Sequence, residues 1–278
     1  AKFQSWSDDT LYAASYYKNN SVVQRIVKKL SLSEDELREL ALYCKEVGIS
    51  FSSTPYSRKE VDALLDFGAP YIKVASMDIN NYSYLRYIAE TGASVVLSTG
   101  MSELNEVRKA VEILQNAGCK NLVLLHCISI YPAPVDTIHL NNILMLRKEF
   151  PECPIGFSDH TLGTEISTAA VALGSAIIEK HFTLDKTKMG MDNNMAIEPD
   201  EMTELVKNCN SVYLAMGNYK RTVSDEEYKQ RKKMRRSVIV TKDLKAGKIL
   251  KLGDLDVKRP GEGISASEME NLVGRTLI

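Results

Sequence analysis

Residues 155–182 read IGFSDHTLGTEISTAAVALGSAIIEKHF and contain the pattern from which the fold class can be predicted. Apolar runs at 155–160 and 176–182 have the length of strands, and residues 164–173 between them have the composition of a helix. Strands that alternate with helices along a chain form a parallel sheet buried on both faces. The stretch therefore predicts an α/β fold.

The same alternation extends in both directions. Ser33 and Glu36 form a capping box at the start of a predicted helix, and further helices are predicted from about residues 58, 82, 103, 137, 164 and 199. The predicted strands are 1–4, 49–54, 71–76, 94–99, 121–129, 155–160 and 176–182. No G-x-G-x-x-G follows a strand, which disfavours an open dinucleotide-binding sheet. We therefore expect a (β/α)8 TIM barrel whose first strand is missing from this chain and would lie just before Ala1.

The character of the chain changes near residue 217. A highly charged stretch is followed by short strand-like pieces at 237–240, 249–252 and 255–257, which are divided by glycines and a proline. We expect three parts: a barrel domain at 1–218, a polar linker or solvated helix at 219–235, and a small β-rich domain at 236–278. A chain of 278 residues is long enough for one large domain and a small one.

The composition excludes several classes of protein. Charged residues make up 26% of the chain and the formal net charge is −1, so the basic excess of a nucleic-acid-binding protein is missing. No apolar run approaches the roughly 20 residues that span a bilayer, so we expect no membrane segment. Five scattered cysteines without a C-x-x-C pair predict reduced thiols in a cytoplasmic protein.

Polar side chains close every predicted strand. The catalytic groups of a barrel stand at the carboxyl ends of its strands. The closing residues are Lys2 and Gln4; Ser53 and Thr54; Lys73 and Ser76; Ser98 and Thr99; Ser129 and Tyr131; Ser158, Asp159 and His160; and Glu179 and His181. Lysines and hydroxyls that converge on one mouth predict a site for a phosphorylated anion.

Two of the four histidines stand at such strand ends. His126 lies within an apolar run and His139 on a predicted surface helix, so we expect both to be structural. His160 and His181 end consecutive strands and should be neighbours, either as a metal-binding pair or as a general acid with its partner. Asp185 or Asp192 could supply a third metal ligand, and Mn²⁺, Mg²⁺ or Zn²⁺ would suit such a site.

An ordered series of short strings resembles the N-acetylneuraminate (sialic acid) synthase family, which includes legionaminic and pseudaminic acid synthases. The strings cover essentially the whole chain in the family's order. They are Lys2-Phe3-Gln4, Ser53-Thr54-Pro55, Lys73-Val74-Ala75-Ser76, Ser98-Thr99-Gly100-Met101, Ile130-Tyr131-Pro132, Gly156-Phe157-Ser158-Asp159-His160-Thr161, Glu179-Lys180-His181-Phe182-Thr183, Glu198-Pro199-Asp200, Arg235-Arg236-Ser237 and Lys258-Arg259-Pro260-Gly261-Glu262-Gly263. The last two resemble the family's antifreeze-like (SAF) domain.

The resemblance implies an enzyme that condenses phosphoenolpyruvate with an N-acylated amino-hexose and water to give a nine-carbon 2-keto sugar acid and phosphate. It implies that His160 and His181 bind Mn²⁺, with Mg²⁺ as the alternative, and that Tyr131 and Asp192 are catalytic. The residues implied to bind phosphoenolpyruvate are Lys2, Thr54, Lys73, Ser76, Ser98, Ser129 and Ser158. Those implied to bind the sugar are Gln4, Asp78 and Arg259. Arg259 would reach the barrel of a second copy, which implies a domain-swapped homodimer.

The chain departs from the family pattern where the sugar should bind. Met77-Asp78 replaces Gly-Glu, Ser129 replaces an asparagine, and Asn193 stands where a loop histidine is usual. We therefore expect the acceptor to be either N-acetylmannosamine or a 2,4-diacetamido-6-deoxyhexose. Two other functions stay open: another phosphate-binding barrel, such as an aldolase with Lys73 as its Schiff-base nucleophile, and a non-catalytic sugar-binding protein.

Overall fold

The computed structural model describes residues 32–188 and 192–278, which divide into two compact units, Ala1–Gly217 and Asn218–Ile278. The predicted strand 1–4, with Lys2 and Gln4, lies outside the described residues. Within the described part of the chain, no helix has the length and apolar character needed to cross a membrane.

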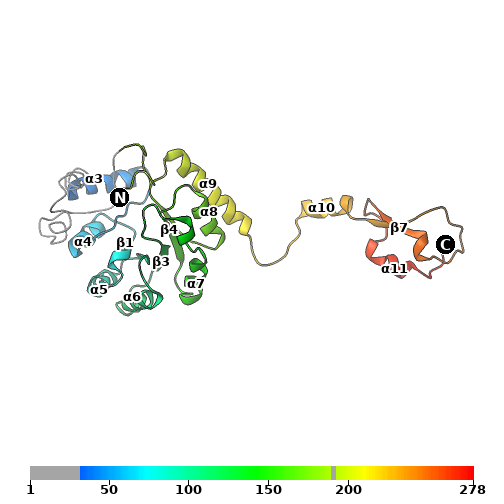
Figure 1. Cartoon of the computed structure of the whole chain (residues 1–278), viewed down its shortest axis with the longest axis horizontal. Coiled ribbons are helices and arrows are strands. Elements are labelled where there is room, and N and C mark those ends of the chain that lie inside the picture. Colours follow the sequence, from blue (N-terminus) through cyan, green and yellow to red (C-terminus); the bar gives the residue numbers. More distant parts are fainter. Residues whose placement is uncertain (1–31, 189–191) are drawn as a thin grey trace. The chain divides into compact units, whose positions relative to one another are not determined.

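Helices and strands alternate through the first unit (Figure 1), as the sequence predicts. Its elements are α3 Glu34–Glu46, α4 Arg58–Asp66, β1 Ile72–Val74, η1 Ser76–Asp78, α5 Tyr82–Glu90, β2 Val95–Ser98, α6 Leu104–Asn116, β3 Leu122–Cys127, η2 Val135–Thr137, α7 Asn141–Glu149, β4 Ile155–Asp159, α8 Glu165–Ala172, β5 Ile178–Lys180 and α9 Pro199–Met216. The capping box of Ser33 and Glu36 begins α3, as predicted, and Glu198 and Glu201 form another at α9.

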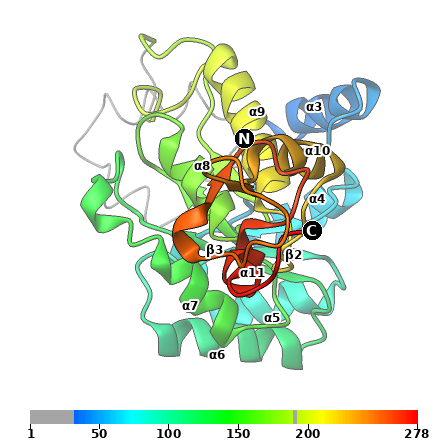
Figure 2. The same cartoon turned by 90° about the vertical axis from the view of Figure 1, so that its right-hand side faces the viewer.

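The five strands form one parallel sheet in the order β1-β2-β3-β4-β5. Because the spatial order follows the chain order, right-handed crossovers place every connecting helix on the same face of the sheet. In Figures 1 and 2, α5, α6 and α7 follow one another along that outer face. The sheet is thus a curved half-barrel, and its other face looks inward.

The core lies between the sheet and these helices. Val95 and Leu97 of β2 and Leu124 of β3 are fully buried, and they pack with Leu85 of α5 and Leu114 of α6 in one apolar cluster. Each such side chain stabilises the fold by about 1.5–3 kcal/mol through its removal from water. This packing holds the strands in register and so fixes where their carboxyl ends lie.

One expectation for the first unit is wrong. Residues 49–54 form no strand, because this segment meets the start of β1 through a side-chain bond, Ser52 Oγ to Tyr71 O at 2.8 Å, rather than through a backbone ladder. The five strands that the structure describes form a half-barrel, and the closed eight-stranded barrel stays a prediction.

The second unit has α10 Asp225–Met234, β6 Ser237–Val240, η3 Leu252–Asp254, β7 Leu255–Lys258, η4 Ala266–Glu268 and α11 Met269–Leu272. Strands β6 and β7 pair antiparallel, from Ser237↔Lys258 to Val240↔Leu255. The expected strand at 249–252 is replaced by an isolated bridge between Ile249 and Thr276. Part of the expected linker is the exposed helix α10, whose charged residues leave no apolar stripe to bury.

Candidate active site

A lysine and two hydroxyls gather around one carboxylate at the carboxyl ends of the strands. Lys73 of β1 is 8% exposed, and its Nζ donates a hydrogen bond of 2.7 Å to Ser98 Oγ of β2. The same Nζ lies 3.6 Å from Glu179 Oε2 of β5. Ser158 Oγ of β4 donates to Glu179 Oε1 at 2.7 Å. These four residues link both edges of the sheet across its inner side.

A second pair of hydroxyls adjoins this group beside Gly100. The Gly100 N–H donates to Ser76 Oγ at 3.0 Å. A Cβ at position 100 would lie 2.4 Å from Ser129 Oγ and 2.9 Å from Ser76 Oγ. Only glycine therefore leaves room for both hydroxyls to lie this close to the backbone at position 100.

The thiol of Cys127 lies among the predicted serines. Burial raises the pKa of Cys127, and hydrogen bonds from Ser76, Ser129 and Ser158 partly oppose that shift. The thiol consequently stays neutral and contributes no charge to the pocket. The sequence pattern predicts no role for Cys127, although the residue stands near the end of the predicted strand 121–129.

The pocket formed by Lys73, Ser76, Ser98, Ser129 and Ser158, called here the anion pocket, combines one buried cation with four hydroxyl groups. A buried ammonium is stable only with an anionic or hydrogen-bonding partner. Hydroxyls supply directed donors to phosphate or carboxylate oxygens. Thr54, also predicted for this pocket, is half-buried in the segment before Pro55.

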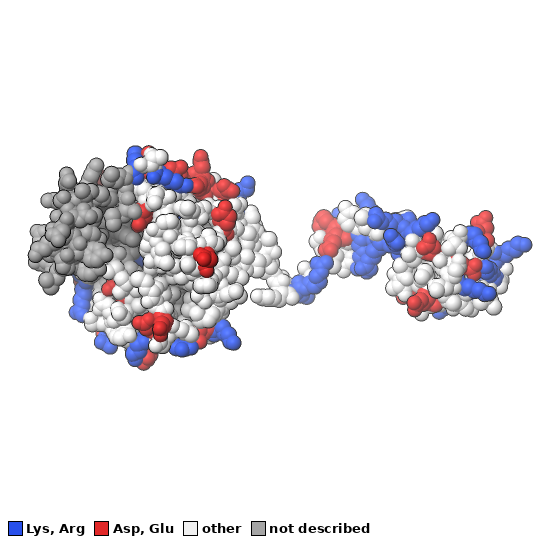
Figure 3. Space-filling view, in the orientation of Figure 1, with Lys and Arg blue, Asp and Glu red and all other residues white. Residues whose placement is uncertain are grey.

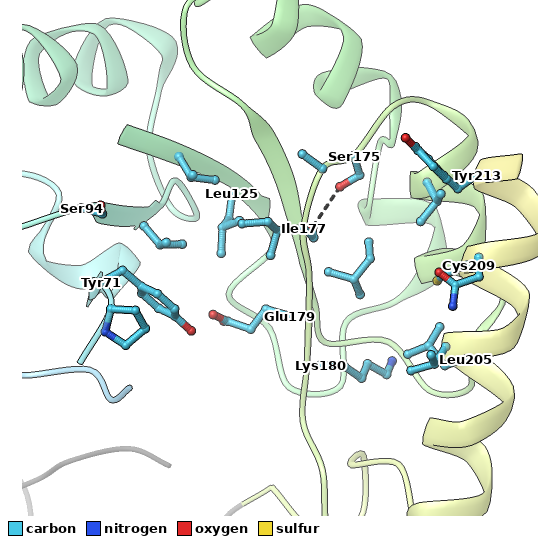
Figure 4. A pocket seen from close by; sticks show the side chains of 18 of the residues that line it. Tyr71, Ser94, Leu125, Ser175, Ile177, Glu179, Lys180, Leu205, Cys209 and Tyr213 are labelled. Atoms are coloured by element: carbon cyan, nitrogen blue, oxygen red, sulfur yellow. Dashed lines mark hydrogen bonds between the residues drawn. The ribbon is translucent and has the colours of Figure 1, made fainter. Parts of the chain in front are cut away.

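Glu179 was predicted to close its strand, but no binding or catalytic role was predicted for it. Its carboxylate contacts both Lys73 and Ser158. Figure 4 shows the Glu179 side chain directed toward Tyr71 on the inner side of the sheet, and the charge of Glu179 adds to burial in raising the pKa of Tyr71.

The two predicted histidines are neighbours. His160 follows β4 and His181 follows β5, and their ring centroids are 5.3 Å apart at an interplanar angle of 68°. The Tyr131 ring packs against both, with centroids 4.2 Å from His160 and 5.9 Å from His181. His181 Nδ1 lies 3.7 Å from Asp192 Oδ2. The structure thus brings together all four residues predicted to be catalytic.

The donor set of the histidine pair suits a divalent metal. His160 Nδ1 lies 2.6 Å from the Ile128 carbonyl oxygen, which only accepts, so Nδ1 carries the proton and Nε2 the lone pair. Metal-binding histidines commonly donate their other nitrogen to a carbonyl in this way. In residues 32–188 and 192–278, no three or more His, Cys, Asp or Glu side chains form a metal-binding group. In open catalytic metal sites, oxygens of water or substrate occupy the positions that the protein leaves free.

The two candidate acidic ligands differ in position. Asp192 lies beside His181, whereas Asp185 Oδ1 accepts hydrogen bonds from the backbone and hydroxyl of Thr187, at 2.9 and 2.6 Å. These bonds lower the pKa of Asp185 and hold it in a local turn. The structure favours Asp192 over Asp185 as the acidic neighbour of the histidines.

Burial governs the ionisation of two further predicted site residues. It raises the pKa of Tyr131 to about 12, helped by the negative charges of Asp192 and Glu179, so the phenol stays protonated at neutral pH. Burial also raises the pKa of Asp78, a residue of η1, although a hydrogen bond from Asn81 acts to lower it.

The remaining predicted residues lie outside this cluster or outside the described part of the chain. Gln4 lies outside the described residues. Arg259 belongs to the second unit, where its Nη1 lies 3.6 Å from Met234 Sδ. His126, expected to be structural, is buried, with Nε2 2.7 Å from the Ile138 carbonyl oxygen.

Fold and site together define an α/β enzyme that acts at the carboxyl ends of parallel strands. The NeuB family description matches residues 1–221, and the SAF domain description matches residues 235–278. The chain therefore belongs to the NeuB family, with a SAF domain, and is an enzyme of the sialic acid synthase type.

Characterised relatives agree with this assignment. The N,N'-diacetyllegionaminic acid synthase of Campylobacter jejuni is 39% identical over 92% of this chain and 77% of its own length. The human N-acetylneuraminate-9-phosphate synthase is 36% identical over 90% of this chain and 70% of its own. The crystal structure of the sialic acid synthetase of Leptospira borgpetersenii, in complex with citrate, has a TM-score of 0.72 and 32% identity over 78% of this chain and 76% of that one.

Proposed function

We propose that this enzyme condenses phosphoenolpyruvate with an N-acylated amino-hexose and water to give a nine-carbon 2-keto sugar acid and phosphate. The observation that carries the proposal is the adjacency of two sites. Ser158 of the anion pocket lies on β4 two residues before His160, and Glu179, which contacts Ser158, lies on β5 two residues before His181. Residues two apart on a strand face the same side. An anion and an aldehyde bound to these groups would therefore be neighbours.

The anion pocket supplies binding and orientation for phosphoenolpyruvate. The ammonium of Lys73 would pair with the phosphate or carboxylate, and Ser76, Ser98, Ser129 and Ser158 would donate to the other oxygens. Because the groups are held by strand ends and by Gly100, little reorganisation would accompany binding.

The acceptor would lie beside His160, His181 and Tyr131. The histidines would hold Mn²⁺ or Mg²⁺, and the bound cation would polarise the acceptor aldehyde as a Lewis acid. The protonated Tyr131 could donate a hydrogen bond to the developing alkoxide.

In the reaction, carbon 3 of phosphoenolpyruvate forms a bond with the aldehyde carbon, whose oxygen takes a proton. Water adds at carbon 2, and cleavage of the bond from carbon 2 to the phosphate oxygen then releases phosphate. The negative charges of the anion pocket's ligand and of Glu179 would stabilise positive charge that develops at carbon 2.

For the acceptor, we propose a 2,4-diacetamido-6-deoxyhexose, with N-acetylmannosamine as the alternative. The similarity to the Campylobacter legionaminic acid synthase supports this choice. Asp78 and Asn193 support it too, because they differ from the family pattern where the sugar is expected to bind, whereas the anion pocket keeps its lysine and hydroxyls.

Phosphate release tests the reaction. Full-length protein with Mn²⁺ and phosphoenolpyruvate should release phosphate only after an acceptor from a panel of the two sugars is added. His160→Ala and His181→Ala should abolish release, whereas Lys109→Met on the exposed face of α6 should not. Phosphate release without an acceptor would contradict the proposal, and so would the absence of release with every sugar of the panel. A borohydride-trapped adduct on Lys73 would instead support an aldolase.

We also propose that the half-barrel is part of a closed (β/α)8 barrel, and that the enzyme is a homodimer in which Arg259 of one copy reaches the site of the other. Opposite charge supports the dimer. Residues 218–278 contain 15 Lys and Arg against 9 Asp and Glu, whereas residues 1–217 contain 20 against 27. Figure 3 shows Lys and Arg gathered on the second unit beyond the acidic start of α10.

A further inference from the structure

A buried ion pair joins the two strands that carry the histidines. Asp159 is the last residue of β4 and Lys180 the last of β5, and the two are partners in the register. Lys180 Nζ lies 2.9 Å from Asp159 Oδ2, with the side chains 2% and 0% exposed. A histidine follows each strand directly, His160 after Asp159 and His181 after Lys180. Each residue of the ion pair therefore immediately precedes one of the two histidines.

The pair lies on the opposite face of the sheet from the site. Successive side chains of a strand point to opposite faces. In Figure 4, the side chains of Glu179 and Lys180 leave β5 in opposite directions, and Lys180 is directed toward Leu205 of α9. Ser167 of α8 donates to Asp159 Oδ2 at 2.5 Å. The two charged side chains are thus buried on the face of the sheet that α8 and α9 cover.

The pair also fixes the residue that follows His160. Asp159 Oδ1 accepts from the Thr161 N–H at 2.8 Å and from its hydroxyl at 2.7 Å, and Lys180 Nζ donates to the Thr161 carbonyl at 2.6 Å. His160 therefore lies between two residues of one hydrogen-bonded network. Its ring also donates through Nδ1 to the Ile128 carbonyl, a bond that requires the backbone at His160 to stay in place.

A contribution to folding stability does not explain why an ion pair, rather than an apolar pair, occupies positions 159 and 180. Removal of two charges from water carries a large desolvation cost, and an apolar pair of similar volume is often as stable or more so. An ion pair with several directed hydrogen bonds does, however, fix one separation and one register between two strands. A site that binds a metal through imidazoles needs that degree of placement, within about 0.5 Å.

We propose that Asp159 and Lys180 are positioning residues, which set the separation and orientation of the His160 and His181 rings and so the affinity of the site for its divalent cation. The inference rests on the proposed function in one respect, that the two histidines form a metal site. Neither residue of the pair touches the substrate.

The test compares metal binding and ring geometry in the full-length protein. In the double variant Asp159→Asn, Lys180→Met, affinity for Co²⁺ alone, titrated by visible absorption, should fall about 10- to 100-fold, as for other groups behind metal ligands. Leu114→Ala, fully buried in α6, is the control for general loosening and should leave Co²⁺ affinity unchanged. The ¹H–¹⁵N spectrum of the metal-free protein should show His160 protonated at Nδ1 in the wild type and a mixture of tautomers in the double variant.

Each outcome decides one proposal. If the wild type binds Co²⁺ through the histidines and the double variant binds it equally well, or if Leu114→Ala loses as much affinity, the positioning role is wrong. If the wild type binds no Co²⁺, the proposed metal site is wrong, and the His160 tautomer alone then decides the positioning role. Should the double variant fail to fold, Lys180→Arg replaces it: lower Co²⁺ affinity at an unchanged melting temperature supports the role, and unchanged affinity overturns it.

Discussion

The Ser158 hydroxyl donates a 2.7 Å hydrogen bond to Glu179 Oε1 across the last two strands of the sheet. The other oxygen of the same carboxylate lies 3.6 Å from Lys73 Nζ. One negative charge therefore shares the donors that we propose for phosphoenolpyruvate. Because like charges repel, Glu179 should weaken the binding of the anion while it is available to stabilise a cationic reaction centre.

Glu179→Gln should therefore bind phosphoenolpyruvate about 2- to 5-fold more tightly in the absence of acceptor, a modest gain because the carboxylate is partly exposed and screened by water. Its rate of phosphate release with acceptor should fall. Isothermal titration gives the affinity, and Glu112→Gln on α6 is the matched surface control. Weaker binding in Glu179→Gln would mean that the carboxylate organises the pocket instead.

Gly100→Ala should disrupt the anion pocket. The added Cβ would lie 2.4 Å from Ser129 Oγ and 3.2 Å from the Cys127 carbonyl oxygen, so side chain or backbone must move. We expect a loss of about 1–3 kcal/mol in the free energy of unfolding and a KM for phosphoenolpyruvate raised by about tenfold or more. Gly253→Ala, where nothing lies within 4 Å, is the control. Wild-type kinetics for Gly100→Ala would show that Ser129 and Ser76 do not bind the substrate.

Asp78→Asn should stabilise the protein at neutral pH. Burial raises the pKa of Asp78 above its usual value, so the folded state holds this proton more tightly than the unfolded state. The contribution of Asp78 to stability is thus complete below about pH 3.9 and is lost as pH rises through its folded pKa. The melting temperature of Asp78→Asn should exceed that of the wild type by about 2 °C at pH 7.5, with a smaller difference near pH 4.5.

The same variant should raise the KM for the amino-sugar and leave the KM for phosphoenolpyruvate unchanged, since Asp78 is proposed to bind the sugar. A difference in melting temperature that grows toward acidic pH would contradict the pKa direction. An unchanged KM for the sugar would remove Asp78 from the sugar site.

The dimer should depend on salt. If the basic second unit of one copy docks on the acidic first unit of the other, ionic strength should weaken the association, because salt screens exposed charges. Sedimentation at 50 mM and 500 mM NaCl measures this, and the dissociation constant should rise several-fold. Arg259→Ala should lower phosphate release without unfolding the chain. A monomer at every salt concentration would contradict the proposal.

The sequence predicted the local order of the chain well. Apolar runs and the capping residues of Ser33 and Glu36 depend on near neighbours, so the alternation of helices and strands could be predicted from them. The conformation of residues 49–54 could not be predicted in this way, because a strand exists only where a partner backbone pairs with it.

What the sequence alone determined was which residues stand at the ends of strands, and hence that His160, His181 and Lys73 share one rim. Tertiary structure decided which side chains face one another there. Three contacts follow from register and from loop closure: Glu179 with Lys73 of the anion pocket, Asp192 rather than Asp185 with His181, and Asp159 with Lys180 next to the histidines. The physical reason is that a shift of one residue moves a strand's side chains to the opposite face, and only long-range packing fixes that shift.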